Sequence, residues 1–215
     1  MKYDTVIFDL DGTLLNTLQD LADSVNEALG EMGMPKRSLE EVRRFVGNGV
    51  AMLMKRAVAA GTDEETYEKA LGCFKKAYMK NSRNKTVVYD GIKELVCELK
   101  KRNIKLAIVS NKIDEAVKEL NRYYFDGAFP VAVGDREGTP KKPSPELVKI
   151  ALNELGSLAD RGLYIGDSDV DIETAKNAGM DCLSVSWGFR TEAELKAFGA
   201  KCIVHSPQEI LNFVD

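Results

Sequence analysis

From Val87 onward the chain alternates short apolar runs with amphipathic segments of roughly ten residues, and this alternation restricts the possible fold most strongly. Strands that alternate with helices of this length form parallel sheets with both faces covered. The sequence therefore predicts an α/β fold with a doubly wound parallel sheet. The expected strands in this region are Lys105–Ser110, Ala128–Val133, Gly162–Gly166, Asp181–Val185 and Cys202–His205.

Capping residues mark the helices between these strands. Ser144 is expected as an N-cap with Pro145 at the first helical position, and Thr191 is followed by Glu194 as in a capping box. Ser168 and Asp171 have the same spacing. Helices are also predicted over Ile92–Lys101, Asp114–Arg122 and Asp169–Ala178, and one is expected to open at Ser206.

The first strand is predicted over Thr5–Leu10, where three apolar residues run straight into Asp9 and Asp11. A continuous apolar run is typical of a strand buried on both faces, and the Asp-Gly pair that follows favours a turn. Ligands of open α/β sheets bind at the carboxyl ends of their strands, and two carboxylates there are costly unless they share a cation or a proton. The alternative is a plain turn in which Asp9 only caps a backbone amide.

Between this strand and the later ones, Leu18–Ser82 carries no strand signal. Its first apolar positions follow a helical three-and-four spacing, and Thr17 with Asp20 resembles a capping box. We therefore expect residues 16–85 to form an inserted helical domain, and residues 1–15 and 86–215 to form the α/β core.

Composition narrows the choice of function. The 215 residues carry a net charge of −4, which gives no argument for binding nucleic acid or an anionic membrane, and no apolar run is long enough to cross a bilayer. The four cysteines are far apart, which favours buried free thiols over a disulfide framework or a zinc site. The expected location is the cytoplasm.

Polar groups follow three further strands. Ser110 and Asn111 end one strand, Lys142 precedes a helix start, and Asp167, Asp169 and Asp171 follow Gly166. Each has a plain alternative: Ser110 as a cap, Lys142 as a solvated loop lysine, and Asp171 as part of a capping box. Their joint occurrence at the carboxyl edge of a parallel sheet instead favours a site for Mg²⁺ and a phosphoryl group.

Four segments resemble the motifs of the haloacid dehalogenase superfamily, in the right order along essentially the whole chain. They are Asp9-Leu10-Asp11-Gly12-Thr13, Ser110-Asn111, Lys142-Pro143-Ser144-Pro145 and Gly166-Asp167-Ser168-Asp169-Val170-Asp171. The last of these, together with Phe45-Val46-Gly47-Asn48-Gly49, is similar to the phosphoglycolate-phosphatase-like subgroup. The resemblance implies a Rossmann-like core with a small α-helical cap inserted after the first motif.

The resemblance also implies roles for the motif residues. Asp9 would be the nucleophile that forms an aspartyl-phosphate, and Asp11 would be the general acid and then the general base. Mg²⁺ would bind Asp9, the backbone carbonyl of Asp11 and Asp167, with Asp171 as a more distant or water-mediated ligand.

Four more residues would hold the phosphoryl group or the substrate. Ser110 and Lys142 would bind the phosphoryl oxygens as charge builds up, and Thr13 and Asn111 would help to bind the substrate. The Lys-Pro-x-Pro spacing favours Lys142 over Lys141 for this role.

In the expected cap, Gly47, Asn48 and Gly49 could offer backbone amides to an anionic leaving group such as the carboxylate of 2-phosphoglycolate. The glycines could equally make only a tight turn between helices.

The expected function is a Mg²⁺-dependent phosphatase of small phosphorylated metabolites, with 2-phosphoglycolate as the leading substrate and a monomer or homodimer as the assembly. Alternatives are an inorganic pyrophosphatase, a β-phosphoglucomutase-like enzyme, or a non-catalytic phosphate-binding protein. Thr13 stands where the mutases usually carry Val, which favours hydrolysis.

Overall fold

The computed structural model describes residues 3–214. These residues divide into two compact units, one made of the residues up to Leu15 together with those from Val88 onward, and the other of Asn16–Val87. The first unit contains the main sheet, and the second is built from helices.

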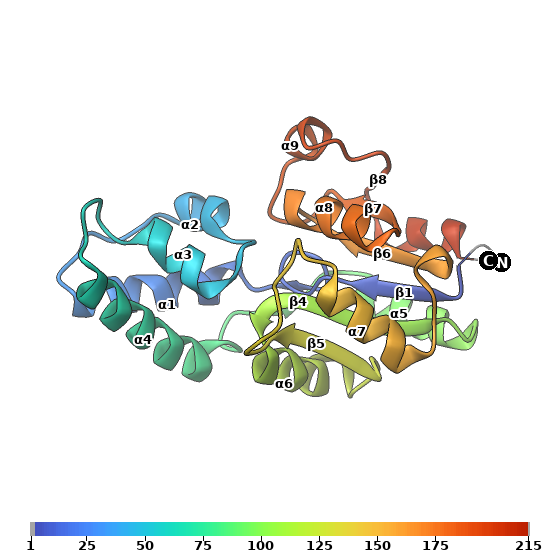
Figure 1. The fold of residues 1–215 in the computed structure, drawn as a ribbon, viewed down its shortest axis with the longest axis horizontal. Coiled ribbons are helices and arrows are strands. Elements are labelled where there is room, and N and C mark those ends of the chain that lie inside the picture. The colour runs from blue at the N-terminus through green and yellow to red at the C-terminus, as the bar shows by residue number, and fades with distance from the viewer. Residues whose placement is uncertain (1–2, 215) are drawn as a thin grey trace. The chain divides into compact units, whose positions relative to one another are not determined.

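The main sheet has the strand order β5-β4-β1-β6-β7-β8, and each pair of neighbours is parallel (Figure 1). β1 lies between β4 and β6, with Thr5 in register with both Lys105 and Gly162. Numbered along the chain, the strands of this sheet lie in the spatial order 3-2-1-4-5-6, which is that of the Rossmann fold. This order confirms the predicted doubly wound α/β architecture. The strands are β1 (Thr5–Phe8), β4 (Lys105–Ile113), β5 (Val131–Asp135), β6 (Gly162–Gly166), β7 (Asp181–Val185) and β8 (Ile203–Val204).

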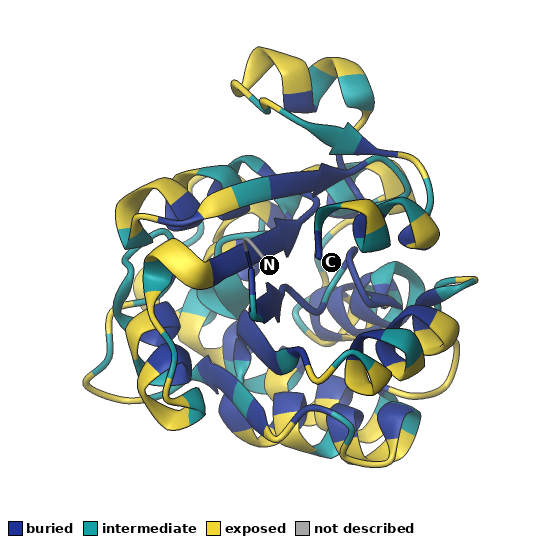
Figure 2. Ribbon diagram, turned by 90° about the vertical axis from the view of Figure 1, so that its right-hand side faces the viewer, coloured by how far each residue is buried: buried dark blue, intermediate teal, exposed yellow. Residues whose placement is uncertain are grey.

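Apolar side chains cover both faces of this sheet. On one face Phe8 and Ile108 pack with α5, α6 and η2, and on the other Ile7 and Val109 pack with α7 and α8. Figure 2 shows the strands as largely buried and the helices as exposed on their outer sides. The helical elements of this unit are α5 (Ile92–Lys101), α6 (Asp114–Phe125), α7 (Glu146–Leu155), η1 (Ala159–Arg161), α8 (Asp169–Ala178), α9 (Glu192–Ala197) and η2 (Pro207–Phe213).

Some element ends differ from the sequence prediction. β4 continues past Ser110 to Ile113, and its pairing with β5 shifts register after Val109. The helix expected to start at Ser144 begins at Glu146 without a side-chain cap, and the expected last helix is a 3₁₀ helix. The capping box at Thr191 is confirmed.

The second unit consists of α1 (Leu18–Glu31), α2 (Leu39–Phe45), α3 (Gly49–Ala57) and α4 (Glu64–Asn81). The capping box expected at Thr17 is wrong: its side chain makes no cap bond, and Asp20 turns inward. There Asp20 accepts hydrogen bonds from the Lys85 amide at 2.9 Å and from the Thr86 amide and hydroxyl, both at 2.8 Å. Short strands β2 (Leu15–Asn16) and β3 (Val87–Val88) pair where the chain passes between the units.

No helix within residues 3–214 combines the length and the apolar character that a bilayer span requires. The cysteines carry free thiols, as expected, but the prediction that they are buried is wrong: Cys97 is exposed, and Cys73, Cys182 and Cys202 are half-buried.

Candidate active site

The candidate site begins at the carboxyl ends of the neighbouring strands β1 and β6. The strand order reverses between these two strands: β4 and β5 follow on one side of β1, and β6, β7 and β8 on the other. Asp9 follows β1 and donates its amide to the Ile165 carbonyl of β6 at 2.9 Å, and Asp167 follows β6. This is the switch point at which open α/β sheets bind their ligands.

Asp9, Asp167 and Asp171 form a buried acidic cluster. Each offers a carboxylate oxygen within 4.8 Å of the others, which among the described residues makes them a group able to hold a metal ion. Burial, with the Asp171 and Asp11 charges, raises the pKa of Asp9 to about 7 although Lys142 opposes this. Burial, with the Asp171 and Asp9 charges, holds the pKa of Asp167 well above its ordinary value.

Burial is the largest cause of both shifts, and it makes ionised carboxylates costly here unless a cation lies beside them. Carboxylate oxygens are the ligands that hard divalent cations prefer, so the residues present fit such an ion. Asp11 is absent from this side-chain cluster; its predicted metal contact is a backbone carbonyl, which stays a prediction.

Lys142 is the buried cation facing this cluster. Its Nζ donates to Asp9 Oδ1 and to Asp171 Oδ1, both at 2.8 Å, and to the Tyr164 hydroxyl at 3.1 Å. Burial lowers the pKa of Lys142, but the Asp171 and Asp9 charges outweigh it and raise that pKa well above its usual value. Lys141 instead pairs with Asp135 at 2.7 Å, so Lys142 rather than Lys141 faces the acidic cluster, and its role toward phosphate stays a prediction.

Asn111 holds the backbone of Lys142. The side-chain amide of Asn111 donates from Nδ2 to the backbone carbonyl of Lys142 at 3.0 Å. Its Oδ1 accepts from the backbone N–H of Lys142 at 2.8 Å. Ser110, buried beside it in β4, accepts a hydrogen bond from the Lys112 amide at 3.3 Å. The irregular end of β4 thus brings these predicted residues to the Lys142 segment.

Asp11 lies opposite a residue that the sequence analysis missed. Lys112 Nζ donates to Asp11 Oδ1 at 2.8 Å and to Oδ2 at 3.0 Å. The Lys112 side chain is 2% exposed, whereas that of Asp11 is 15% exposed. The two carboxylates of the first motif are therefore separated: Asp9 faces Lys142 and Asp11 faces Lys112.

The turn after Asp11 packs directly on Asp167. Gly12 has a φ of +90°, and a Cβ there would lie 2.9 Å from Asp167 Oδ1, closer than real side chains approach. Thr13, predicted to bind the substrate, donates its hydroxyl to Asp167 Oδ1 at 3.3 Å. The plain-turn alternative for this segment leaves these contacts unexplained.

Asp171 also forms a capping box with Ser168, which was the alternative interpretation of this residue. Its Oδ2 accepts from the Ser168 hydroxyl at 2.6 Å and from the Ser168 amide at 3.1 Å, while its Oδ1 faces Lys142. Helix capping and the acidic cluster thus use opposite oxygens of one carboxylate.

In the second unit Gly47 and Asn48 lie between α2 and α3, and Gly49 is the first residue of α3. Gly47 and Gly49 have positive φ angles of 126° and 82°, and the Asn48 side chain accepts from Arg56 at 2.9 Å instead of capping α3. The part of these residues in substrate binding remains a prediction.

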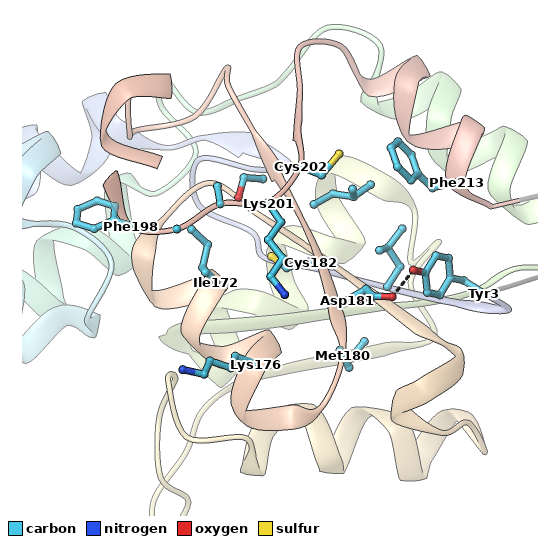
Figure 3. Close-up of a pocket in the computed structure, with 15 residues that line it drawn as sticks. Tyr3, Ile172, Lys176, Met180, Asp181, Cys182, Phe198, Lys201, Cys202 and Phe213 are labelled. Atoms are coloured by element: carbon cyan, nitrogen blue, oxygen red, sulfur yellow. Dashed lines mark hydrogen bonds between the residues drawn. The ribbon is translucent and has the colours of Figure 1, made fainter. Parts of the chain in front are cut away.

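A cavity of about 690 Å³ lies elsewhere in the first unit, along β7 and the segment that follows α9 (Figure 3). Lys176, Lys201 and Cys182 line it, and Tyr3 donates its hydroxyl to Asp181 at one side. The predicted site residues all lie outside this cavity.

Comparison with known proteins gives consistent results. Residues 6–185 match the family model described as haloacid dehalogenase-like hydrolase. The phosphoglycolate phosphatase of Pseudomonas putida (strain KT2440) is 32% identical over 212 residues, which cover 96% of this chain and 78% of the relative. That of Aquifex aeolicus is 35% identical over 185 residues, covering 86% and 85%.

A solved structure shows the same fold. The candidate phosphoglycolate phosphatase from Lactobacillus delbrueckii subsp. bulgaricus superposes with a TM-score of 0.94 at 33% identity, covering 100% of this chain and 99% of that one. The strand order, the acidic cluster with its lysine, and these matches lead to one assignment. The chain belongs to the haloacid dehalogenase-like hydrolase family.

Proposed function

We propose that the protein is a Mg²⁺-dependent phosphatase that hydrolyses small phosphorylated metabolites, with 2-phosphoglycolate as the leading substrate. The observation that carries the proposal is the buried contact of Asp9 with Lys142 at 2.8 Å, beside Asp167 at the switch point of the sheet. The phosphoglycolate phosphatases among its relatives support the substrate class.

In the first step a carboxylate oxygen of Asp9 attacks phosphorus, and the bond from phosphorus to the leaving oxygen breaks. The product is an aspartyl-phosphate on Asp9 and the free alcohol. Asp11, two residues further on and directed to a different partner, donates the proton that the leaving oxygen needs.

In the second step water attacks the phosphorus of the aspartyl-phosphate. Asp11 takes the proton from this water, and the Asp9 carboxylate is released together with inorganic phosphate. In this proposal Lys112 holds one oxygen of Asp11 while the other carries the proton, and it donates to both oxygens when Asp11 is ionised.

Lys142 and Ser110 stabilise the charge that develops on the phosphoryl oxygens, and Asn111 holds Lys142 in place. Asp9, the backbone carbonyl of Asp11 and Asp167 would hold Mg²⁺, with Asp171 further out. When bound, the ion supplies positive charge to the phosphoryl group and keeps Asp9 ionised.

The second unit would act as a cap that selects the leaving group. In this proposal the backbone amides at Gly47, Asn48 and Gly49 bind the carboxylate of 2-phosphoglycolate. The first amides of a helix have no acceptor within that helix, which makes the start of α3 a suitable kind of site for an anion.

The test is phosphate release by the full chain with Mg²⁺ and a panel of 2-phosphoglycolate, pyrophosphate, nucleoside monophosphates and sugar phosphates. Asp9→Asn should abolish turnover, while Asp160→Asn, an exposed carboxylate in η1, serves as the matched control. Ranking by kcat/KM identifies the substrate. No turnover above Asp9→Asn would contradict the enzyme proposal, and isomerisation of glucose 1-phosphate without hydrolysis would contradict the phosphatase assignment.

A further inference from the structure

The loop after β7, Trp187-Gly188-Phe189-Arg190, lies against the candidate site. Trp187 donates its indole N–H to the Thr13 carbonyl at 3.0 Å, and its ring packs on the main apolar core. The loop is thereby attached to the turn that carries the first motif.

Gly188 makes the closest approach. A Cβ at this position would lie 2.6 Å from Asp167 Oδ2 and from the Gly12 carbonyl oxygen, and closer still to the Asp167 Cβ. The obstructing atoms belong to a backbone and to the root of a side chain, which cannot move aside as the end of a long side chain can. Only glycine therefore lets this loop close on Asp167.

Phe189 provides a direct bond to the same carboxylate. Its backbone N–H donates to Asp167 Oδ2 at 2.6 Å, while Thr13 donates to Asp167 Oδ1 at 3.3 Å. Donors from two distant segments thus fix both oxygens of Asp167. Arg190, itself buried, extends the arrangement with its Nε 3.6 Å from Asp169 Oδ1.

We propose that the Trp187–Arg190 loop is a positioning element that fixes the orientation of the Asp167 carboxylate relative to Asp9 and thereby sets the affinity for the divalent cation. The inference rests on the proposed function in one respect, that Asp167 binds the cation. Partners that orient a ligating carboxylate typically change metal affinity by about 10- to 100-fold when they are altered.

The main experiment measures Mg²⁺ binding to the full chain by isothermal titration calorimetry. Gly188→Ala should weaken binding by about 10- to 100-fold, because the new methyl group displaces Asp167. Turnover at saturating Mg²⁺ should fall much less than the affinity does. Gly72→Ala is the matched control, since a Cβ there meets nothing within 4 Å.

Trp187→Phe tests the loop without steric conflict, because it removes the N–H donor and keeps an aromatic ring. We expect Mg²⁺ binding to weaken by a smaller factor of about 3 to 10. This variant decides the question if Gly188→Ala does not fold.

In the wild type, Trp187 is the single tryptophan, so its fluorescence emission should shift on Mg²⁺ binding and report on this loop alone.

A double-variant comparison isolates the path of action. If the loop acts through Asp167, then Asp167→Asn with Gly188→Ala should bind Mg²⁺ no more weakly than Asp167→Asn alone. Wild-type affinity in both Gly188→Ala and Trp187→Phe would overturn the positioning role and leave the proposed function standing. A wild-type protein that binds no Mg²⁺ would overturn the cation role in the proposed function, and this inference with it.

Discussion

Lys112 donates from one ammonium group to both carboxylate oxygens of Asp11, at 2.8 and 3.0 Å, from a side chain that is almost wholly buried. A lysine in such a position fixes the direction of the carboxylate. The geometry of the proposed acid and base is thus set by the end of β4, about a hundred residues away along the chain.

Lys112→Met should therefore lower kcat by about tenfold or more while the protein stays folded, because Asp11 loses the partner that directs it. Steady-state kinetics with saturating Mg²⁺ measures the effect. The double variant with Asp11→Asn should be no slower than Asp11→Asn alone. Independent, multiplying losses would show that Lys112 acts on the substrate by a separate route.

Replacing Asp167 should have opposite effects on stability and on function. With the cation removed by a chelator, Asp167→Asn relieves the repulsion within a buried acidic cluster and keeps an acceptor for the Phe189 amide, so it should raise Tm by about 2–4 °C. When Mg²⁺ is added, the Tm of the wild type should exceed that of the variant. Thermal unfolding with and without Mg²⁺ tests this, and a lower Tm for the variant under chelation would contradict it.

Asp20 should be the main polar support of the second unit. Its carboxylate is 1% exposed and accepts from two backbone amides and one hydroxyl, so Asp20→Ala leaves these buried donors without a partner. We expect a loss of about 3 kcal/mol in the free energy of unfolding. The control is Asp23→Ala, which removes an exposed pair with Lys85 and should cost less than about 1 kcal/mol. Denaturant titrations measure both variants, and an equal loss in the free energy of unfolding would contradict this prediction.

Asp114 should make stability depend on acid pH. Burial raises the pKa of Asp114, but hydrogen bonds from Lys118 and the Gly134 amide, with the Arg136 charge, bring it below its ordinary value. A carboxylate whose pKa is lowered by folding stabilises the protein above its unfolded pKa, and this contribution is lost as pH falls through the folded pKa. Asp114→Asn should be less stable than the wild type at pH 7, and the gap should close in strong acid. A gap independent of pH would argue against this role.

The fold could be predicted from the sequence because its two patterns are clear: continuous apolar runs for the buried strands and a three-and-four apolar spacing for the helices. Apolar runs such as Leu106–Val109 indicated buried strands, and parallel strands bring their carboxyl ends to one edge. Asp9, Lys142 and Asp167 meet for that reason, and no contact information was needed to expect it.

Other parts of the site could not be read in the same way. Lys112 follows the end of an apolar run, in the part of β4 where the pairing with β5 shifts register, so alternation does not predict that this lysine is buried. Tyr164 lies in a strand with both faces buried, where alternation does not tell which side chains face Lys142. The Trp187–Arg190 loop acts through one backbone amide and a missing side chain, which leave no pattern of charge or hydrophobicity.

The central place of β1 also has a consequence for how the protein is made. This fully buried strand is synthesised well before its partners, β4 and β6, which begin at Lys105 and Gly162. At the usual rates of synthesis, both edges of β1 stay unpaired for roughly 5 to 20 seconds before β4 is made. Such long-range parallel pairing folds slowly and leaves apolar edges open to other chains in the meantime. Nascent chains stalled before β6 should therefore be the form of this protein that most needs a chaperone.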